Sequence, residues 1–161
     1  MAFGYQTPES QGIHTSDVYA LLQFMKNHIF HPDALIIARN GAIVTEAYWK
    51  PFGPGQKHII QSASKSFTAL AMGFLIDEGR VHLDDKMVDF FPERLPSYYD
   101  KRLNKITVKD LLMMAASIAR TPAIFTGVTS SWITDYFSLP LVNEPGTTFR
   151  YDTGGSMMLS A

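Results

Sequence analysis

The chain has 161 residues, of which 46% are hydrophobic and 18% charged, and its formal net charge at pH 7 is −1. This composition is typical of one globular domain, or of a piece of a larger one, and it excludes global disorder. The balanced charge gives no electrostatic basis for binding nucleic acid, so we expect no nucleic-acid partner. The absence of cysteine excludes disulfides, thiol catalysis and cysteine-ligated metals.

The N-terminus shows no readable sorting signal. Residues 1–12 lack the basic segment and apolar core of a secretory signal. No stretch approaches the length of a membrane span, since the apolar run after Ser66 ends at Asp77-Glu78-Gly79. We therefore expect a cytoplasmic protein without a membrane span, unless a leader has been removed.

The first third of the chain predicts a helix followed by a β-hairpin. Apolar residues at helical spacing follow Ser16, an expected N-cap. Residues 34–49 then have the composition of two strands. Asn40-Gly41 divides the two strands, and this dipeptide is a strong signal for a two-residue hairpin turn.

The middle of the chain predicts a long helix over about 62–78, with apolar side chains on all its faces. A helix of this kind is typically buried. We expect the region 80–161 to be mostly helical, with one helix over 108–116. A shorter helix follows, with Ser130 or Ser131 as its N-cap.

The last residues, 156–161, have the pattern of the first turns of another apolar helix, without a stop signal or polar tail. Two strands alone also make a marginal sheet. We therefore expect residues 1–161 to be the N-terminal part of one larger domain whose C-terminal part is absent. The alternative is a complete small α+β domain. An incomplete core predicts that a homo-oligomer or a complementing chain covers it.

Ser62 and Lys65 are the strongest candidates for chemistry. Three residues apart at the start of a helix, they share one helix face. A serine there can lose its proton to a neighbouring base, and the first turn of the helix stabilises negative charge. This spacing is that of an S-x-x-K serine acyl-enzyme. The alternative is that Ser62 only caps the helix and Lys65 is a solvated residue of its first turn.

Tyr151 is a second candidate, since a tyrosine near a lysine can act as a general base through its phenolate. The alternative is that Tyr151 only packs beside Phe149. Tyr5 stands in a similar local pattern but at an unanchored N-terminus, which makes it the poorer candidate. None of the five histidines forms a metal-spaced pair on a helix, so we expect no metal. Glycine-rich phosphate-binding loops are also absent from the sequence, and we expect no other cofactor.

Several stretches of the chain together resemble the serine β-lactamase and penicillin-binding-protein-like hydrolases, nearest to the class C β-lactamase and esterase branch. They stand in the order of that family, which makes the set far more specific than any one motif. The stretches are Ser10–Ile13, Glu46–Tyr48, Ser62–Ala69, Glu78–Asp85, Thr107–Leu112 and Pro145–Tyr151.

The resemblance implies a role for each site residue. Ser62 would be the acylated nucleophile, and Lys65 would help to deprotonate it. Tyr151 would match the tyrosine of the family's Tyr-x-Asn motif, a proton carrier. Thr153 stands where asparagine is usual, so a substrate-binding amide would be replaced by a hydroxyl.

Two further departures concern the rest of the site. Ala115–Ile118 replaces the usual turn that contains histidine and Ser-Gly. The third motif of the family, Lys-Thr-Gly or His-x-Gly, is absent; Phe125-Thr126-Gly127 resembles it slightly but precedes Tyr151 and lacks the cation. In the family that strand also supplies one of the two oxyanion-hole N–H groups.

The sequence thus predicts an α/β (α+β) fold: part of a β-lactamase-like catalytic domain, with an antiparallel hairpin packed against the helix that bears Ser62 and an adjoining helical region. We expect a serine hydrolase that forms an acyl-enzyme with an ester, an amide or a β-lactam, poorly active as a 161-residue chain. The alternatives are a non-catalytic binding module that keeps the fold and a small α+β domain in which Ser62 is only a helix cap.

Overall fold

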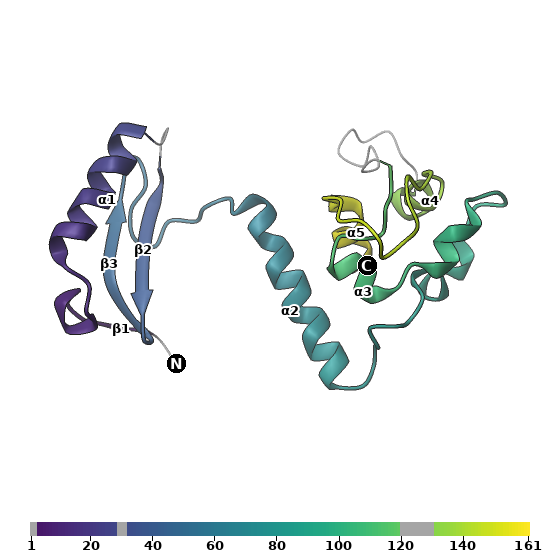
Figure 1. Ribbon diagram of the computed structural model, residues 1–161, viewed down its shortest axis with the longest axis horizontal. Coiled ribbons are helices and arrows are strands. Elements are labelled where there is room, and N and C mark those ends of the chain that lie inside the picture. The colour runs from purple at the N-terminus through teal and green to yellow at the C-terminus, as the bar shows by residue number, and fades with distance from the viewer. Residues whose placement is uncertain (1–2, 29–31, 120–130) are drawn as a thin grey trace. The chain divides into compact units, whose positions relative to one another are not determined.

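The computed structural model describes residues 3–28, 32–119 and 131–161, and it forms two compact units, Met1–Ile59 and Ile60–Ala161 (Figure 1). The assignment of both units to one catalytic domain stays a prediction, as does the packing of the hairpin on the helix that bears Ser62. In the described ranges no helix has the length and apolar character needed to cross a membrane.

The N-terminal unit is a helix and a three-stranded sheet. The helix α1 spans Thr15–His28. The sheet has the order β1-β3-β2, in which β3 pairs antiparallel with β2 and parallel with β1. The strands are β1 Gly4–Tyr5, β2 Ala34–Arg39 and β3 Ala42–Tyr48.

The predicted hairpin is confirmed, and so is its turn. Asn40 and Gly41 have φ angles of +51° and +75°. Two consecutive left-handed residues are what a tight hairpin turn needs to match the twist of its strands. The sequence did not predict β1, because two residues are too few to show an alternating pattern; its pairing makes the sheet mixed.

The C-terminal unit begins with a 3₁₀ turn, Gln61–Ala63, that leads into the long helix α2, Ser64–Asp77. The predicted helix is present, but within this unit it is not buried on all its faces. Met72 is its one buried residue, whereas Phe67, Leu70 and Phe74 are 66%, 57% and 62% exposed. The apolar pattern identifies the helix, but no described element of this unit covers that face.

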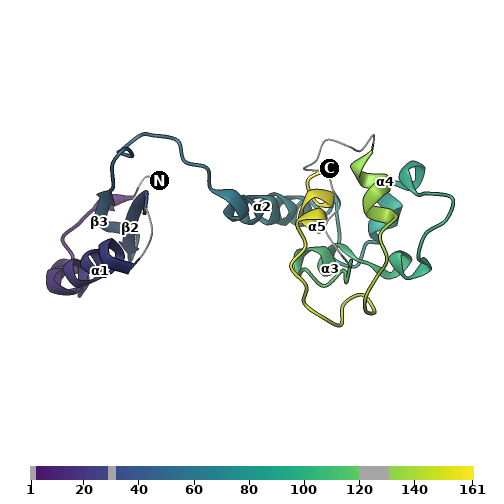
Figure 2. The same ribbon diagram turned by 90° about the horizontal axis from the view of Figure 1, so that it is seen from above.

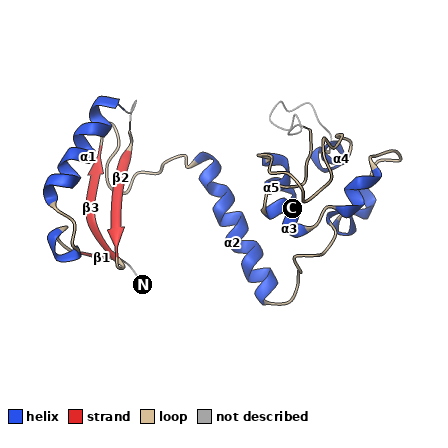
Figure 3. Ribbon diagram, in the orientation of Figure 1, coloured by secondary structure: helices blue, strands red, loops and turns tan. Residues whose placement is uncertain are grey.

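Among the described residues, three short α-helices follow α2, and α5 lies beside α3 in the turned view (Figure 2). They are α3 Val108–Leu112, α4 Trp132–Phe137 and α5 Thr153–Met158. Apart from two isolated bridges, the described segments of this unit are helices, turns and loops (Figure 3). Its core gathers large buried side chains from all of them, among them Met87, Leu103, Ile106, Tyr136 and Phe137.

Side-chain caps mark where α3 and α4 begin. Thr107 and Asp110 form a reciprocal capping box at the start of α3. Ser131 caps α4, as one of the two predicted alternatives; Ser130 lies outside the described residues. The helix α5 begins at Thr153, three residues before the predicted start, because Gly154 and Gly155 hide the helical pattern.

The helix α3 is shorter than predicted. It ends at Leu112 instead of continuing to about Ala116. Met114 and Ser117 take left-handed φ angles of +54° and +63°, which no α-helix contains. The expected helical turn is therefore replaced by an irregular segment whose carbonyl groups accept hydrogen bonds from residues 142–150.

Candidate active site

Ser62 lies at the centre of the 3₁₀ turn that leads into α2. The residue before it, Gln61, has a φ of +48°, in the left-handed region that non-glycine residues rarely adopt. Such a conformation costs about 1–3 kcal/mol and persists only where the surroundings impose it. The chain therefore makes a strained bend immediately before Ser62, and strain of this kind concentrates at functional sites.

Two other side chains converge on the hydroxyl of Ser62. Lys65, in the first turn of α2, donates a hydrogen bond from Nζ to Ser62 Oγ at 3.1 Å. Tyr151, 89 residues away in the chain, donates from its phenol to the same oxygen at 2.6 Å. Lys65 Nζ also lies 5.2 Å from the centre of the Tyr151 ring, within range of a cation–π contact. The structure thus brings together the three side chains that the sequence analysis singled out.

The phenol of Tyr151 has a pKa below its ordinary value of 10.0. The hydrogen bond with Ser62 is the largest cause, followed by the interaction with Lys65, whose positive charge favours the phenolate. About half of the Tyr151 side chain is exposed, so solvent can exchange protons with it. A phenol in this setting can take up and return a proton more readily than free tyrosine.

A cleft of about 380 Å³ opens beside Ser62, between the start of α2 and α5. Thr153, the predicted substrate-binding residue, lies in its wall. Most of the lining side chains carry hydroxyl groups, and Lys65 is the one charged group among those described. The lining residues are Gln61, Ser62, Ser64, Lys65, Thr68, Thr153, Ser156, Met157 and Ser160.

Backbone hydrogen bonds fix the segment that leads to Tyr151. This segment runs along residues 114–119, whose left-handed residues turn carbonyl groups toward it. The bonds are Val142 N–H to Ser117 O at 2.9 Å, Gly146 N–H to Ala115 O at 2.8 Å, and Arg150 N–H to Met114 O at 2.8 Å. The position of Tyr151 thus depends on the irregular turn that replaces the end of the predicted helix.

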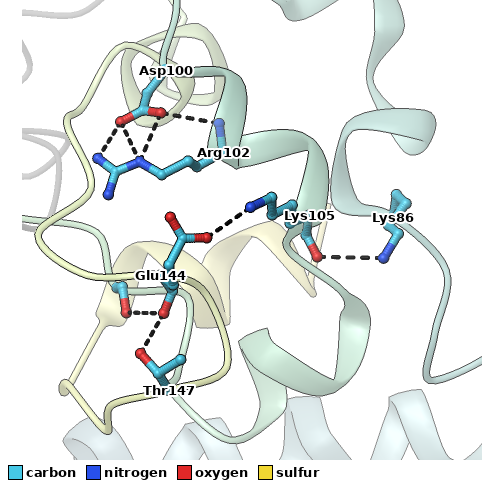
Figure 4. A network of polar contacts seen from close by, with 7 residues as sticks. Lys86, Asp100, Arg102, Lys105, Glu144 and Thr147 are labelled. Atoms are coloured by element: carbon cyan, nitrogen blue, oxygen red, sulfur yellow. Dashed lines mark hydrogen bonds and ion pairs between the residues drawn. The ribbon is translucent and has the colours of Figure 1, made fainter.

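A network of polar side chains also contacts the segment that leads to Tyr151 (Figure 4). Arg102 binds the Asp100 carboxylate through two nitrogens and also donates to Leu141 O at 2.9 Å. Lys105 donates to the Glu144 carboxylate at 2.9 Å. Lys105 and Arg102 belong to one 3₁₀ helix, Lys101–Lys105, so this helix holds two points of the loop before Tyr151.

The Asp100 carboxylate is expected to make stability depend on pH. Hydrogen bonds from Arg102 lower its pKa from 3.8 to about 2. Because the folded pKa is the lower one, the ion pair stabilises the protein fully above about pH 4 and is lost as the pH falls toward 2. Urea unfolding of the wild type and of Asp100→Asn should show a difference in free energy that shrinks over this interval. A free-energy difference between the wild type and Asp100→Asn that stays constant between about pH 4 and pH 2 would contradict the assignment.

The other sequence candidates lie elsewhere. Tyr5 donates its phenolic hydrogen bond to the Glu46 carboxylate, within the N-terminal unit. Ser64 donates to Gln61 O at 2.8 Å, as expected of a hydroxyl at a helix start. Phe125-Thr126-Gly127 lies outside the described residues. The sequence analysis assigned no role to Asp152, although a charged residue two positions before Gly154-Gly155 was a signal for a special position.

Solved structures share the fold of this chain. EstA from Arthrobacter nitroguajacolicus Rue61a matches 98% of the chain with a TM-score of 0.62 and 22% identity. A Bacillus anthracis protein named as a candidate 6-aminohexanoate-dimer hydrolase matches 86% of it with a TM-score of 0.69 and 19% identity. The chain spans 42% and 40% of these two proteins, respectively. At such identities the likeness shows the fold, a partial β-lactamase-like α/β fold.

The class of fold is therefore β-lactamase-like. Over residues 20–161 the sequence matches the family described as Beta-lactamase, and the chain belongs to that family. A curated relative, the 6-aminohexanoate-dimer hydrolase of Paenarthrobacter ureafaciens, is 35% identical over 68 residues, which are 42% of this chain and 17% of that protein. The resemblance identified from the motifs is thus confirmed.

Proposed function

We propose that this chain carries the nucleophile and the activating groups of a serine hydrolase that forms an acyl-enzyme with an ester or amide, β-lactams included. The observation that carries the proposal is the convergence of Lys65 Nζ and the Tyr151 hydroxyl on Ser62 Oγ. Membership of a hydrolase family supports the reaction class. The name of the related 6-aminohexanoate-dimer hydrolase supports a small-molecule substrate.

The geometry supports a simple sequence of proton transfers. Tyr151, as a phenolate stabilised by the Lys65 ammonium, takes the proton of Ser62 while Oγ forms a bond to the substrate carbonyl carbon. The tetrahedral intermediate then breaks its bond to the leaving alcohol or amine, which receives the proton from Tyr151. A water molecule, deprotonated by Tyr151, then attacks the acyl carbon. The bond from this carbon to Ser62 Oγ breaks, Oγ regains its proton from Tyr151, and the carboxylic acid product leaves.

Thr153 is the proposed substrate contact, because it lines the cleft beside Ser62. By the family resemblance, one oxyanion donor is the backbone N–H of Ser62 and the other belongs to the strand of the third motif. Residues 1–161 contain neither Lys-Thr-Gly nor His-x-Gly. Because one missing oxyanion donor lowers a rate about 100- to 1000-fold, we expect the chain to turn over substrate slowly and to show acylation more clearly.

Acyl-enzyme formation tests the proposal. The chain is incubated with p-nitrophenyl acetate or with benzylpenicillin, and its intact mass is measured over time. We expect the wild type and Ser66→Ala, the matched control, to gain the mass of the acyl group. Ser62→Ala should gain none; an undiminished adduct in this variant would overturn the proposal.

A further inference from the structure

Asp152 links the backbone beside Tyr151 to the buried core of the C-terminal unit. Its side chain is 5% exposed, and its Oδ2 accepts a hydrogen bond from the Tyr136 phenol at 2.6 Å. Tyr136 belongs to α4 and is fully buried. Burial, followed by the charge of Asp152, raises the pKa of the Tyr136 phenol well above 10.0, so this phenol remains a donor. The pair is a fixed connection between α4 and the start of α5.

The surroundings of this pair are tight. A Cβ atom on Gly155 would lie 3.0 Å from Asp152 Oδ2 and 3.3 Å from the Tyr136 hydroxyl, so α5 can approach the pair only with glycine at this position. Asp152 Oδ1 is buried and has no hydrogen-bond partner among the described residues. A buried acceptor in that state costs about 1–3 kcal/mol. The Asp152 carboxylate therefore lowers the stability of the fold where it lies, and we look for a function that explains its position.

Tyr151 has few contacts that could hold it in place. Its side chain is 53% exposed, and its hydroxyl binds Ser62. Its backbone is fixed on one side by the bond from Arg150 N–H to Met114 O and on the other by the buried side chain of Asp152. We propose that the Tyr136–Asp152 pair is a positioning device that sets the Tyr151 hydroxyl against Ser62. For the consequences in catalysis, this inference rests on the proposed function of Tyr151.

Tyr136→Phe tests the inference, since it removes the donor and keeps the charge of Asp152. The readout is the pKa of Tyr151, measured by NMR titration of protein labelled at the tyrosine Cζ atoms, with the resonance assigned through Tyr151→Phe. We expect this pKa, lowered in the wild type, to move back toward 10.0 in Tyr136→Phe. The matched control is Tyr99→Phe, which removes a phenol bound to Asn104 at 3.0 Å and should leave the Tyr151 pKa unchanged.

A double variant, Tyr136→Phe/Asp152→Leu, keeps the test valid if the single variant unfolds. It removes both partners, so no buried polar group of the pair is left unmatched and the fold is retained. Loss of the Asp152 charge by itself would lower the Tyr151 pKa. A rise of this pKa in the double variant would therefore mean that the Tyr151 hydroxyl is no longer held against Ser62. An unchanged Tyr151 pKa in folded Tyr136→Phe overturns the inference, as does an equal rise in Tyr99→Phe. If the single variant unfolds, a lower Tyr151 pKa in the double variant overturns it.

The titration separates this inference from the proposed function, because it needs no reaction at Ser62. A raised Tyr151 pKa in Tyr136→Phe supports positioning even if the wild type forms no acyl-enzyme, a result that would contradict the proposed function alone. Normal acylation of Ser62 together with an unchanged Tyr151 pKa would contradict positioning alone. As a second readout, Tyr136→Phe should slow acylation in the wild-type background and have no further effect in Tyr151→Phe, whereas its effect on stability should be equal in both.

Discussion

Replacement of Lys65 by methionine is expected to slow acylation of Ser62 severely. The substitution keeps the length of the side chain and its helix propensity. It removes the ammonium group that donates to Ser62 Oγ and favours the phenolate of Tyr151. Since a positioned acid–base group contributes about 100- to 10,000-fold, we expect a loss of roughly a thousandfold. The rate is measured as covalent labelling by a fluorophosphonate, followed by intact mass.

Lys109→Met is the matched control for this experiment. Lys109 is an exposed lysine in α3, away from the residues that line the cleft. It should label at the wild-type rate, and both variants should unfold like the wild type. Labelling of Lys65→Met at the wild-type rate would contradict the role proposed for this lysine.

The purified chain is expected to associate with a second copy of itself. Phe67, Leu70 and Phe74 lie at helical spacing on one face of α2, and each is more than half exposed. Full burial of one large apolar side chain contributes about 1.5–3 kcal/mol, so covering all three is a strong driving force. Contiguous exposed apolar surface of this kind is typical of an interaction site.

Sedimentation velocity over a range of concentrations measures this association. We expect species larger than a monomer for the wild type and a shift toward monomer for Phe67→Lys/Phe74→Lys. Tyr98→Lys is the control, because Tyr98 is also exposed but lies far along the chain from this face. A wild-type monomer at all concentrations would contradict the prediction and would show that no second copy covers this face.

The features that the sequence predicts well are those that depend on neighbouring residues. Asn40-Gly41 defines the hairpin turn through its own backbone preferences, and the two strands follow from it. Ser131, one of the two caps predicted for α4, marks a helix start through a side chain that reaches only three residues along the chain. Local chemistry decides these elements, so no knowledge of the tertiary structure is needed.

The site is predictable only in part for the same reason. Helical geometry alone places Lys65 beside Ser62. No spacing relates Tyr151 to these two residues, and its prediction depends on the acid–base chemistry of tyrosine and on the order of the family motifs. The bond between Asp152 and Tyr136 depends on how α4 and α5 pack, which no local pattern encodes. The exposure of apolar side chains on α2 could not be predicted either, because an apolar sequence pattern does not reveal which other surface covers the helix.

Peptide mapping of the adduct tests the central claim most directly. The wild-type chain is labelled with a fluorophosphonate and digested, and the modified residue in the peptide that contains the S-x-x-K motif is located by tandem mass spectrometry. The account predicts a single adduct on Ser62, the hydroxyl on which Lys65 and Tyr151 converge. An adduct on Ser64 or Ser66, with Ser62 unmodified, would contradict it.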